Sequence, residues 1–69
     1  MSNLYAIRTE KGMTQTKLAE LSGINARQIR KIETGEIKTK NITVGTITAL
    51  ANALGVGIEE LIKENAEKN

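Results

Sequence analysis

The fold is decided by residues 13–35, which read MTQTKLAELSGINARQIRKIETG. Thr14 is of a residue type that caps helix N-termini, and the segment after it carries apolar residues at helical spacing. Gly23 would end this helix, because glycine readily adopts the left-handed conformation that closes many helices. Asn25 can cap a second helix, which runs to Gly35. The stretch therefore predicts two short helices joined by a tight turn.

The second of these helices has two opposite faces. At about 100° per residue, Ile29 and Ile32 fall on one side. The other side carries three cations with no acid between them, namely Arg27, Arg30 and Lys31. The isoleucines would hold the helix on the domain, so the cations would face outward. Two helices in this arrangement form a helix-turn-helix, whose second helix is narrow enough to enter the DNA major groove.

Helical spacing recurs in three further segments of the chain. They are residues 3–11 before Gly12, residues 43–54 between the cap Thr43 and Gly55, and residues 58–62. Leu21 and Val44 are among the apolar residues that we expect in a shared core. We therefore predict an all-α, compact five-helix bundle whose second and third helices form the helix-turn-helix. One domain would occupy residues 1–64, and residues 65–69 would form a frayed tail.

The composition excludes several classes of protein. The chain has 69 residues, enough for one small domain, and it contains no Cys, His or Asp. Disulfides, zinc sites built on Cys or His, and catalytic triads therefore cannot be assembled. We expect neither an enzyme nor a protein with a metal or organic cofactor. The absence of a signal peptide and of a long apolar run predicts a cytoplasmic protein, associated with the nucleoid when it is bound to DNA.

Charge is divided unevenly along the chain. Residues 1–40 hold eight basic and four acidic side chains, whereas residues 41–69 hold two basic and four acidic ones. A positive surface favours an anionic polymer such as DNA, although an ordinary solvated surface would give the same counts. Tyr5 is the single aromatic residue, so stacking on unpaired bases has little support and RNA is the poorer candidate.

The residues that carry these patterns resemble a known family. Residues 13–35, followed by ANALGV at 51–56 and IEELI at 58–62, are similar to the lambda-repressor and Cro type of helix-turn-helix, the XRE family. The resemblance covers roughly residues 4–62, with a loop after Gly35 that is longer than in the commonest form of the family. It implies a DNA-binding domain that acts as a homodimer on a near-palindromic operator. The expected function is therefore sequence-specific binding of double-stranded DNA by a repressor-type transcriptional regulator.

The resemblance also implies roles for individual positions. Base contacts would fall to Ala26, Arg27, Arg30 and Lys31. Phosphate contacts would fall to Thr14, Gln15, Lys17, Lys38 and Lys40, and Gln15 would also brace the recognition helix. Arg8 and Glu33 match a pair that forms an internal salt bridge, so their expected role is structural. Of the base-contact residues, Arg27 can donate to guanine O6 and N7, whereas Ala26 can at most touch a thymine methyl group.

A second interpretation uses the same fold without reading DNA. A protein-interaction module, of the antitoxin or coactivator-adaptor type, would fit the small size, the modest net charge and Ala26 at a reading position. Its working surface would be the apolar edge of the fifth helix and the acidic C-terminal residues. For a homodimer the candidate contacts are Val56, Ile58 and Ile62, of which we expect at least two to lie in the core instead. No small-molecule ligand is expected.

Overall fold

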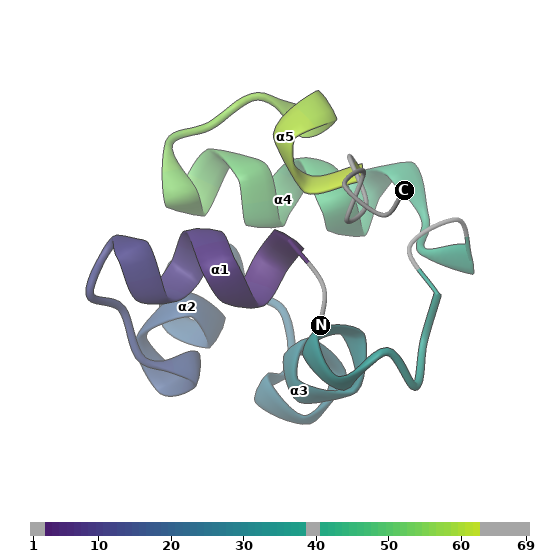
Figure 1. Ribbon diagram of the computed structural model, residues 1–69, viewed down its shortest axis with the longest axis horizontal. Helices are drawn as coiled ribbons and strands as arrows, with labels where there is room; N and C mark the ends of the chain where they lie inside the picture. Colours follow the sequence, from purple (N-terminus) through teal and green to yellow (C-terminus); the bar gives the residue numbers. More distant parts are fainter. Residues whose placement is uncertain (1–2, 39–40, 63–69) are drawn as a thin grey trace.

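Five helices follow one another along the chain in the computed structural model, which describes residues 3–38 and 41–62 (Figure 1). They are α1 (Asn3–Glu10), α2 (Gln15–Ser22), α3 (Ala26–Thr34), α4 (Val44–Leu54) and α5 (Ile58–Ile62). The described residues contain no strand, so the predicted all-α fold is confirmed. The expected boundary between a domain at 1–64 and a tail at 65–69 lies outside the described residues.

Side-chain caps begin three of the helices at the predicted residues. Thr14 Oγ1 accepts a hydrogen bond from Lys17 N at 3.0 Å in the first turn of α2. Before α3, Asn25 Oδ1 accepts a hydrogen bond from Arg27 N at 2.7 Å. Thr43 Oγ1 accepts one from a backbone N–H in the first turn of α4 at 3.2 Å. Each cap satisfies an N–H group that its helix cannot pair internally, and this fixes where the helix begins.

The turn between α2 and α3 is closed by Gly23. Its φ of 76° lies in the left-handed region, where a side chain would add strain, and its N–H donates to Ala19 O at 2.9 Å. Ser22 Oγ accepts a hydrogen bond from Ile24 N at 3.1 Å, which fixes the next peptide group. Residues 23–25 alone separate the two helices, so α3 is held directly beside α2.

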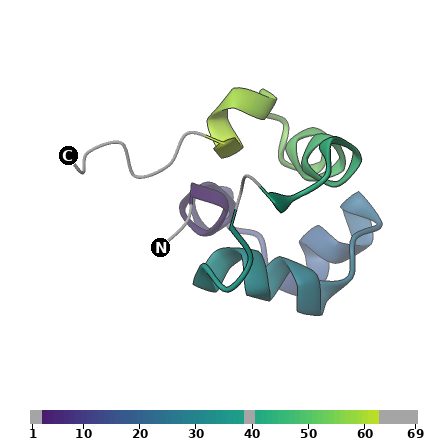
Figure 2. The same ribbon diagram turned by 90° about the vertical axis from the view of Figure 1, so that its right-hand side faces the viewer.

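One apolar core joins the helices. Leu18 of α2, Ile29 of α3 and Leu50 of α4 are its most deeply buried large side chains. α2 packs against α3 and α4, while α1 packs against α3 and α5, as Figures 1 and 2 show from two directions. α3 therefore has one side on the core and the other at the lower edge of the molecule (Figure 2). No helix within the described ranges has the length and apolarity that a membrane crossing requires.

Two residues expected in the core lie at the surface instead. Leu21 is 53% exposed and Val44 is 74% exposed, so the prediction for both was wrong. The inner face of α2 is centred on Leu18, which is fully buried one turn before Leu21. Val44 is the first residue of α4, and the buried side of that helix begins at Ile47. Helical spacing identifies an apolar stripe, but neighbouring helices decide how much of the stripe is covered.

Candidate nucleic-acid interface

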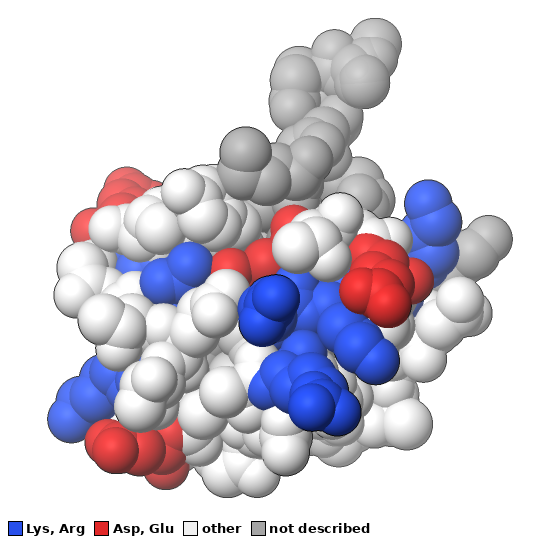
Figure 3. Space-filling view, turned by 90° about the horizontal axis from the view of Figure 1, so that it is seen from below, with Lys and Arg blue, Asp and Glu red and all other residues white. Residues whose placement is uncertain are grey.

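α3 presents different faces to the core and to solvent, as the spacing of its residues predicts. Ile29 and Ile32 are buried. Arg27 and Arg30 are exposed, and Lys31 is half-buried. Figure 3 shows basic side chains gathered on this side of the molecule. We call Arg27, Arg30 and Lys31 the α3 basic face.

The α3 basic face lines an open hollow of about 530 Å³. Thr34 in the last turn of α3 and Glu36 just after the helix complete the lining. Thr34 Oγ1 donates a hydrogen bond to Lys31 O at 3.2 Å, so this hydroxyl is held along the helix. Among the described residues, no group of three His, Cys, Asp or Glu side chains lies close enough to hold a metal ion. The hollow therefore offers three cationic side chains and one acid to a ligand from outside.

The structure brings together three of the four residues expected to contact bases. Arg27, Arg30 and Lys31 share the hollow, whereas Ala26 does not line it. Ala26 is nevertheless exposed, and it begins α3 one residue before Arg27. Its position is therefore adjacent to the α3 basic face, while its methyl group adds no hydrogen-bonding capacity.

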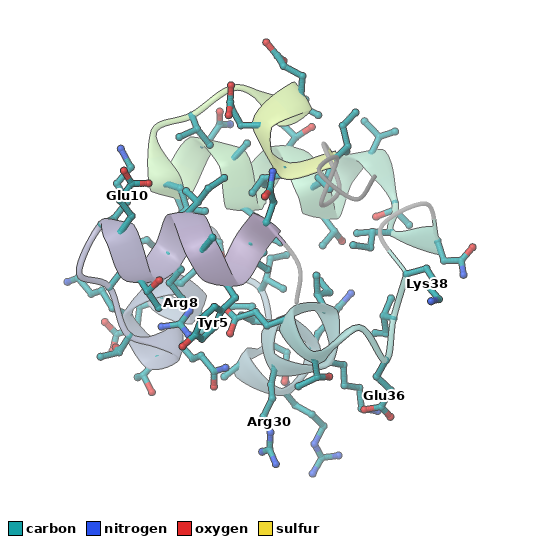
Figure 4. All side chains as sticks on the ribbon, viewed as in Figure 1. Tyr5, Arg8, Glu10, Arg30, Glu36 and Lys38 are labelled. Atoms are coloured by element: carbon teal, nitrogen blue, oxygen red, sulfur yellow. The ribbon has the colours of Figure 1, made fainter. Side chains whose placement is uncertain are left out.

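The residues expected to contact phosphates fall into separate places. Thr14, Gln15 and Lys17 lie together at the start of α2, where N–H groups and a cation suit an anion. Lys38 is exposed in the loop after α3, and Figure 4 shows it on the other side of the molecule from α2. Lys40 lies outside the described residues. The four of these residues that the structure describes therefore do not form one cluster.

The loop that carries Lys38 is anchored on the domain. Ile37 and Ile42 are half-buried and pack against the core. Ile37 N donates to Lys31 O at 3.1 Å, and Asn41 N donates to Lys38 O at 2.9 Å. Apolar packing and backbone hydrogen bonds therefore anchor the chain at Ile37 before Lys38 and at Asn41 and Ile42 after it.

A buried ion pair connects α1 to the end of α3. Arg8 Nε lies 2.5 Å from Glu33 Oε2, and Arg8 Nη2 donates to Glu33 Oε1 at 3.0 Å. Arg8 Nη1 donates to Met13 O at 2.6 Å, and the guanidinium carbon lies 5.4 Å from the centre of the Tyr5 ring (Figure 4). The hydrogen bond to Glu33 raises the pKa of Arg8, against the opposite effect of burial. The structure thus joins the two residues to which the family resemblance assigns a salt bridge.

Gln15 extends this pair by bracing α3, as the family resemblance implies, through a partner that the sequence did not identify. Gln15 Nε2 donates to Glu33 Oε1 at 2.9 Å. Because an ionised carboxylate only accepts hydrogen bonds, the Gln15 amide must turn its NH₂ group toward Glu33. One argument could have predicted a second donor to Glu33. A buried carboxylate needs several hydrogen-bond donors, and a single arginine need not supply them all. The start of α2 is therefore linked to the end of α3 through a side chain expected to meet DNA.

The apolar surface near α5 is larger than the sequence suggested. Val56 packs against the core, but Ile58 and Ile62 are 36% and 49% exposed. The prediction that at least two of these three residues belong to the core was therefore wrong. α5 has five residues, and Leu61 is the residue that it buries, so a helix this short covers little with its inner side.

Comparisons with known proteins agree with this geometry. Residues 4–61 match the family model described as helix-turn-helix. The chain is 38% identical over 66 residues to the uncharacterized HTH-type transcriptional regulator y4dJ of Sinorhizobium fredii, a match that covers 96% of this chain and 82% of that protein. It is 31% identical over 67 residues to the control protein C.SmaI of Serratia marcescens, with 97% and 76% covered. An HTH-type transcriptional regulator of Acanthamoeba polyphaga mimivirus is 39% identical over 53 residues, which are 77% of this chain and 24% of that protein.

An all-α domain with a helix-turn-helix at α2 and α3 and exposed cations on α3 defines a class of DNA-binding proteins. The chain belongs to the helix-turn-helix family of the XRE type. This is a family of DNA-binding transcriptional regulators rather than of enzymes, and DNA is the partner that membership implies.

Proposed function

We propose that this regulator binds double-stranded DNA sequence-specifically, with α3 in the major groove, and acts as a repressor. The observation that carries the proposal is the α3 basic face, which is open to solvent opposite the buried isoleucines of the same helix. A helix with cations on its outer side fits the width and the charge of the major groove. A regulator bound in this way would keep other proteins from the operator, and it would be associated with the nucleoid.

Arg27 is the principal base-reading residue in this proposal. It is exposed at the second position of α3, and its guanidinium can donate two hydrogen bonds to guanine O6 and N7. Arg30 and Lys31 line the same hollow one turn later, so they would meet neighbouring bases. Ala26 would contribute contact with a thymine methyl group.

Phosphate contacts would set the register and orientation of α3 without reading sequence. At the start of α2 they would come from Thr14, Gln15 and Lys17, and from the N–H groups of the helix terminus. In the loop after α3 they would come from Lys38 and Lys40. The partly buried hydrogen bond from Gln15 to Glu33 supports this assignment, because it holds the start of α2 in place relative to α3.

A homodimer on a near-palindromic operator completes the proposal. Two copies of a single helix-turn-helix would place their α3 helices about 34 Å apart, one turn of the duplex. The exposed side chains of Ile58 and Ile62 are the candidate contact between the copies. Sedimentation that detects a monomer both free and on operator DNA would remove the dimer from the proposal.

Selection from a random-sequence duplex library, followed by affinity measurements at two salt concentrations, tests the function directly. We expect a two-fold-related motif with half-sites about one helical turn apart, and an affinity that falls as salt rises. Reporter expression from a promoter that carries the selected motif then tests repression. Recovery of no motif, with weak binding driven by salt alone, would contradict sequence-specific reading.

The exposed apolar residues of α5 favour one competing function, a protein-interaction module of the antitoxin or coactivator-adaptor type. Ile58 and Ile62 would then contact a different protein rather than a second copy. Replacement of Ile62 by Asn separates the two functions. Loss of DNA affinity through weaker dimerisation supports the regulator, whereas unchanged DNA binding with loss of a captured partner supports the interaction module.

A further inference from the structure

One acidic side chain, that of Glu36, lies beside the cations of the α3 basic face. Glu36 is exposed and lines the same hollow as the α3 basic face. Figure 4 shows Glu36 on the same outer edge of the molecule as Arg30, and Figure 3 shows acidic atoms beside the basic patch. The proposed function, which rests on cations, does not use this residue.

The backbone holds Glu36 in place. Gly35 before it closes α3 with a φ of 88°, and its N–H donates to Ile32 O at 3.2 Å. Ile37, the residue that follows Glu36, packs against the core, and its N–H donates to Lys31 O at 3.1 Å. Glu36 is therefore fixed between two anchored residues, so its position beside the α3 basic face is a property of the fold.

Stabilisation of the domain does not account for this acid. Within residues 3–38 and 41–62, the ion pair with an N···O distance below 4 Å is that of Arg8 with Glu33. Glu36 forms no ion pair with the residues of these ranges. An exposed carboxylate on a surface that faces DNA repels the phosphates, because like charges brought together weaken association. Glu36 would therefore be unfavourable for binding unless the DNA offers it a hydrogen-bond donor.

The major groove supplies such donors. The three side chains of the α3 basic face can only donate, so they suit guanine O6 and N7 or thymine O4. Cytosine N4 and adenine N6 present amino groups in the same groove, and a glutamate carboxylate accepts from such an amino group. A hollow with three donor side chains and one acceptor can therefore form hydrogen bonds with both bases of a G·C pair. A surface that carries donors alone can bond to the guanine but cannot accept from the cytosine amino group.

We propose that Glu36 is a specificity-determining residue that accepts a hydrogen bond from the exocyclic amino group of one cytosine or adenine in the operator. This inference rests on the proposed function, since it requires α3 in the major groove. At other sequences the same carboxylate faces guanine or thymine oxygens. It therefore raises specificity both by attraction to the operator and by repulsion of other DNA.

Two variants separate the acceptor from the charge. Glu36→Ala removes both, whereas Glu36→Gln removes the charge and keeps a carbonyl oxygen that accepts hydrogen bonds. Glu59→Gln is the matched control, since it removes one exposed acid from α5, far from α3 in Figure 1. Because Glu36 is exposed, both Glu36 variants should keep their melting temperature within about 3 °C of the unchanged protein.

Library selection and competition with single-base substitutions of the selected operator provide the readouts. We expect Glu36→Ala to lose its preference for cytosine or adenine at one position, by about 5- to 20-fold. Its affinity for random duplex DNA should rise about 3- to 10-fold, because one repulsive charge is gone. Glu36→Gln should keep part of the preference, and the substitution series identifies which base donates. Glu59→Gln should change neither readout.

The possible outcomes separate this inference from the function on which it rests. An unchanged motif with equally tighter binding to every duplex would overturn the inference, since Glu36 would then act through its charge alone. No change in either readout would also overturn it. Failure of the unchanged protein to enrich any motif would remove the proposed function and the inference together.

Discussion

Arg8 and Arg27 have the same side chain but lie in two contrasting regions of this domain. Arg8 is 8% exposed and is paired with Glu33, which is 3% exposed. Arg27 is exposed on the α3 basic face, and no acid of the described residues lies within 4 Å of its charge. The buried charges are satisfied inside the protein and join α1 to α3, whereas the exposed charge is available to a polyanion. Burial, rather than residue type, therefore separates the structural arginine from the candidate binding one.

Glu33→Ala removes the buried ion pair with Arg8 and should have the largest effect on stability. It leaves the buried Arg8 guanidinium unpaired and removes the acceptor of Gln15. We expect the free energy of unfolding to fall by about 3–5 kcal/mol, measured by urea denaturation. Glu36→Ala is the control, because that acid is exposed and should change stability by less than about 0.5 kcal/mol. A loss below about 1 kcal/mol for Glu33→Ala would contradict a structural role for the pair.

Arg27→Ala tests whether the exposed arginine of the α3 basic face contacts a base. Because Arg27 is proposed to donate to a guanine, its removal should cost about 1–3 kcal/mol of binding free energy and relax preference at one base position. Stability should stay within about 0.5 kcal/mol, since the side chain is exposed. Competition binding and library selection measure the first effect, and urea denaturation measures the second. Uniform weakening on all sequences would remove Arg27 from the base contacts.

Thr14→Ala tests a residue that has both a structural role and a proposed role in DNA binding. Thr14 caps α2 through its hydrogen bond from Lys17 N, and it is also a proposed phosphate contact. Loss of the cap should lower stability by about 1 kcal/mol, as read from thermal unfolding. Thr16→Ala is the matched control, because Thr16 is exposed inside α2 and caps nothing. Equal stability of the two variants would show that the cap contributes nothing measurable.

Lys38→Ala should have the smallest effect. An exposed lysine that meets a phosphate contributes less than about 1 kcal/mol, equally on all sequences. The slope of log affinity against log salt concentration should become shallower by about one unit, as measured by titrations at four salt concentrations. Lys11→Ala removes an exposed cation from the turn after α1 and should leave the slope unchanged. A sequence-dependent effect of Lys38→Ala would place this residue on a base instead.

Local residue chemistry predicted most of the fold. Thr14, Asn25 and Thr43 cap the helices that their residue types favour, and Gly23 and Gly35 close helices in the left-handed conformation that glycine allows. These features depend on a few adjacent residues, which is why the sequence is sufficient to identify them. The opposite faces of α3 follow from the helical period in the same way.

Predictions that depended on contacts between distant segments were less successful. Leu21, Val44, Ile58 and Ile62 are exposed although each lies at helical spacing from another apolar residue. The exposure of a side chain depends on which helix packs over it, and the period of its own helix does not contain this information. The hydrogen bond from Gln15 to Glu33 joins residues 18 positions apart, so the sequence did not identify Glu33 as the partner through which Gln15 braces α3.

Neighbouring residues in the sequence are sufficient to predict the helices, the capped starts of three of them, the turn at Gly23 and the cationic outer side of α3. Only the packed structure reveals that Glu36 shares a hollow with the α3 basic face, and that Gln15 donates to the same buried carboxylate that Arg8 contacts. Those placements result from the packing of α1, α2 and α3 around one core. Packing brings together charges that lie far apart in the chain, and it also decides which of them water or DNA can reach.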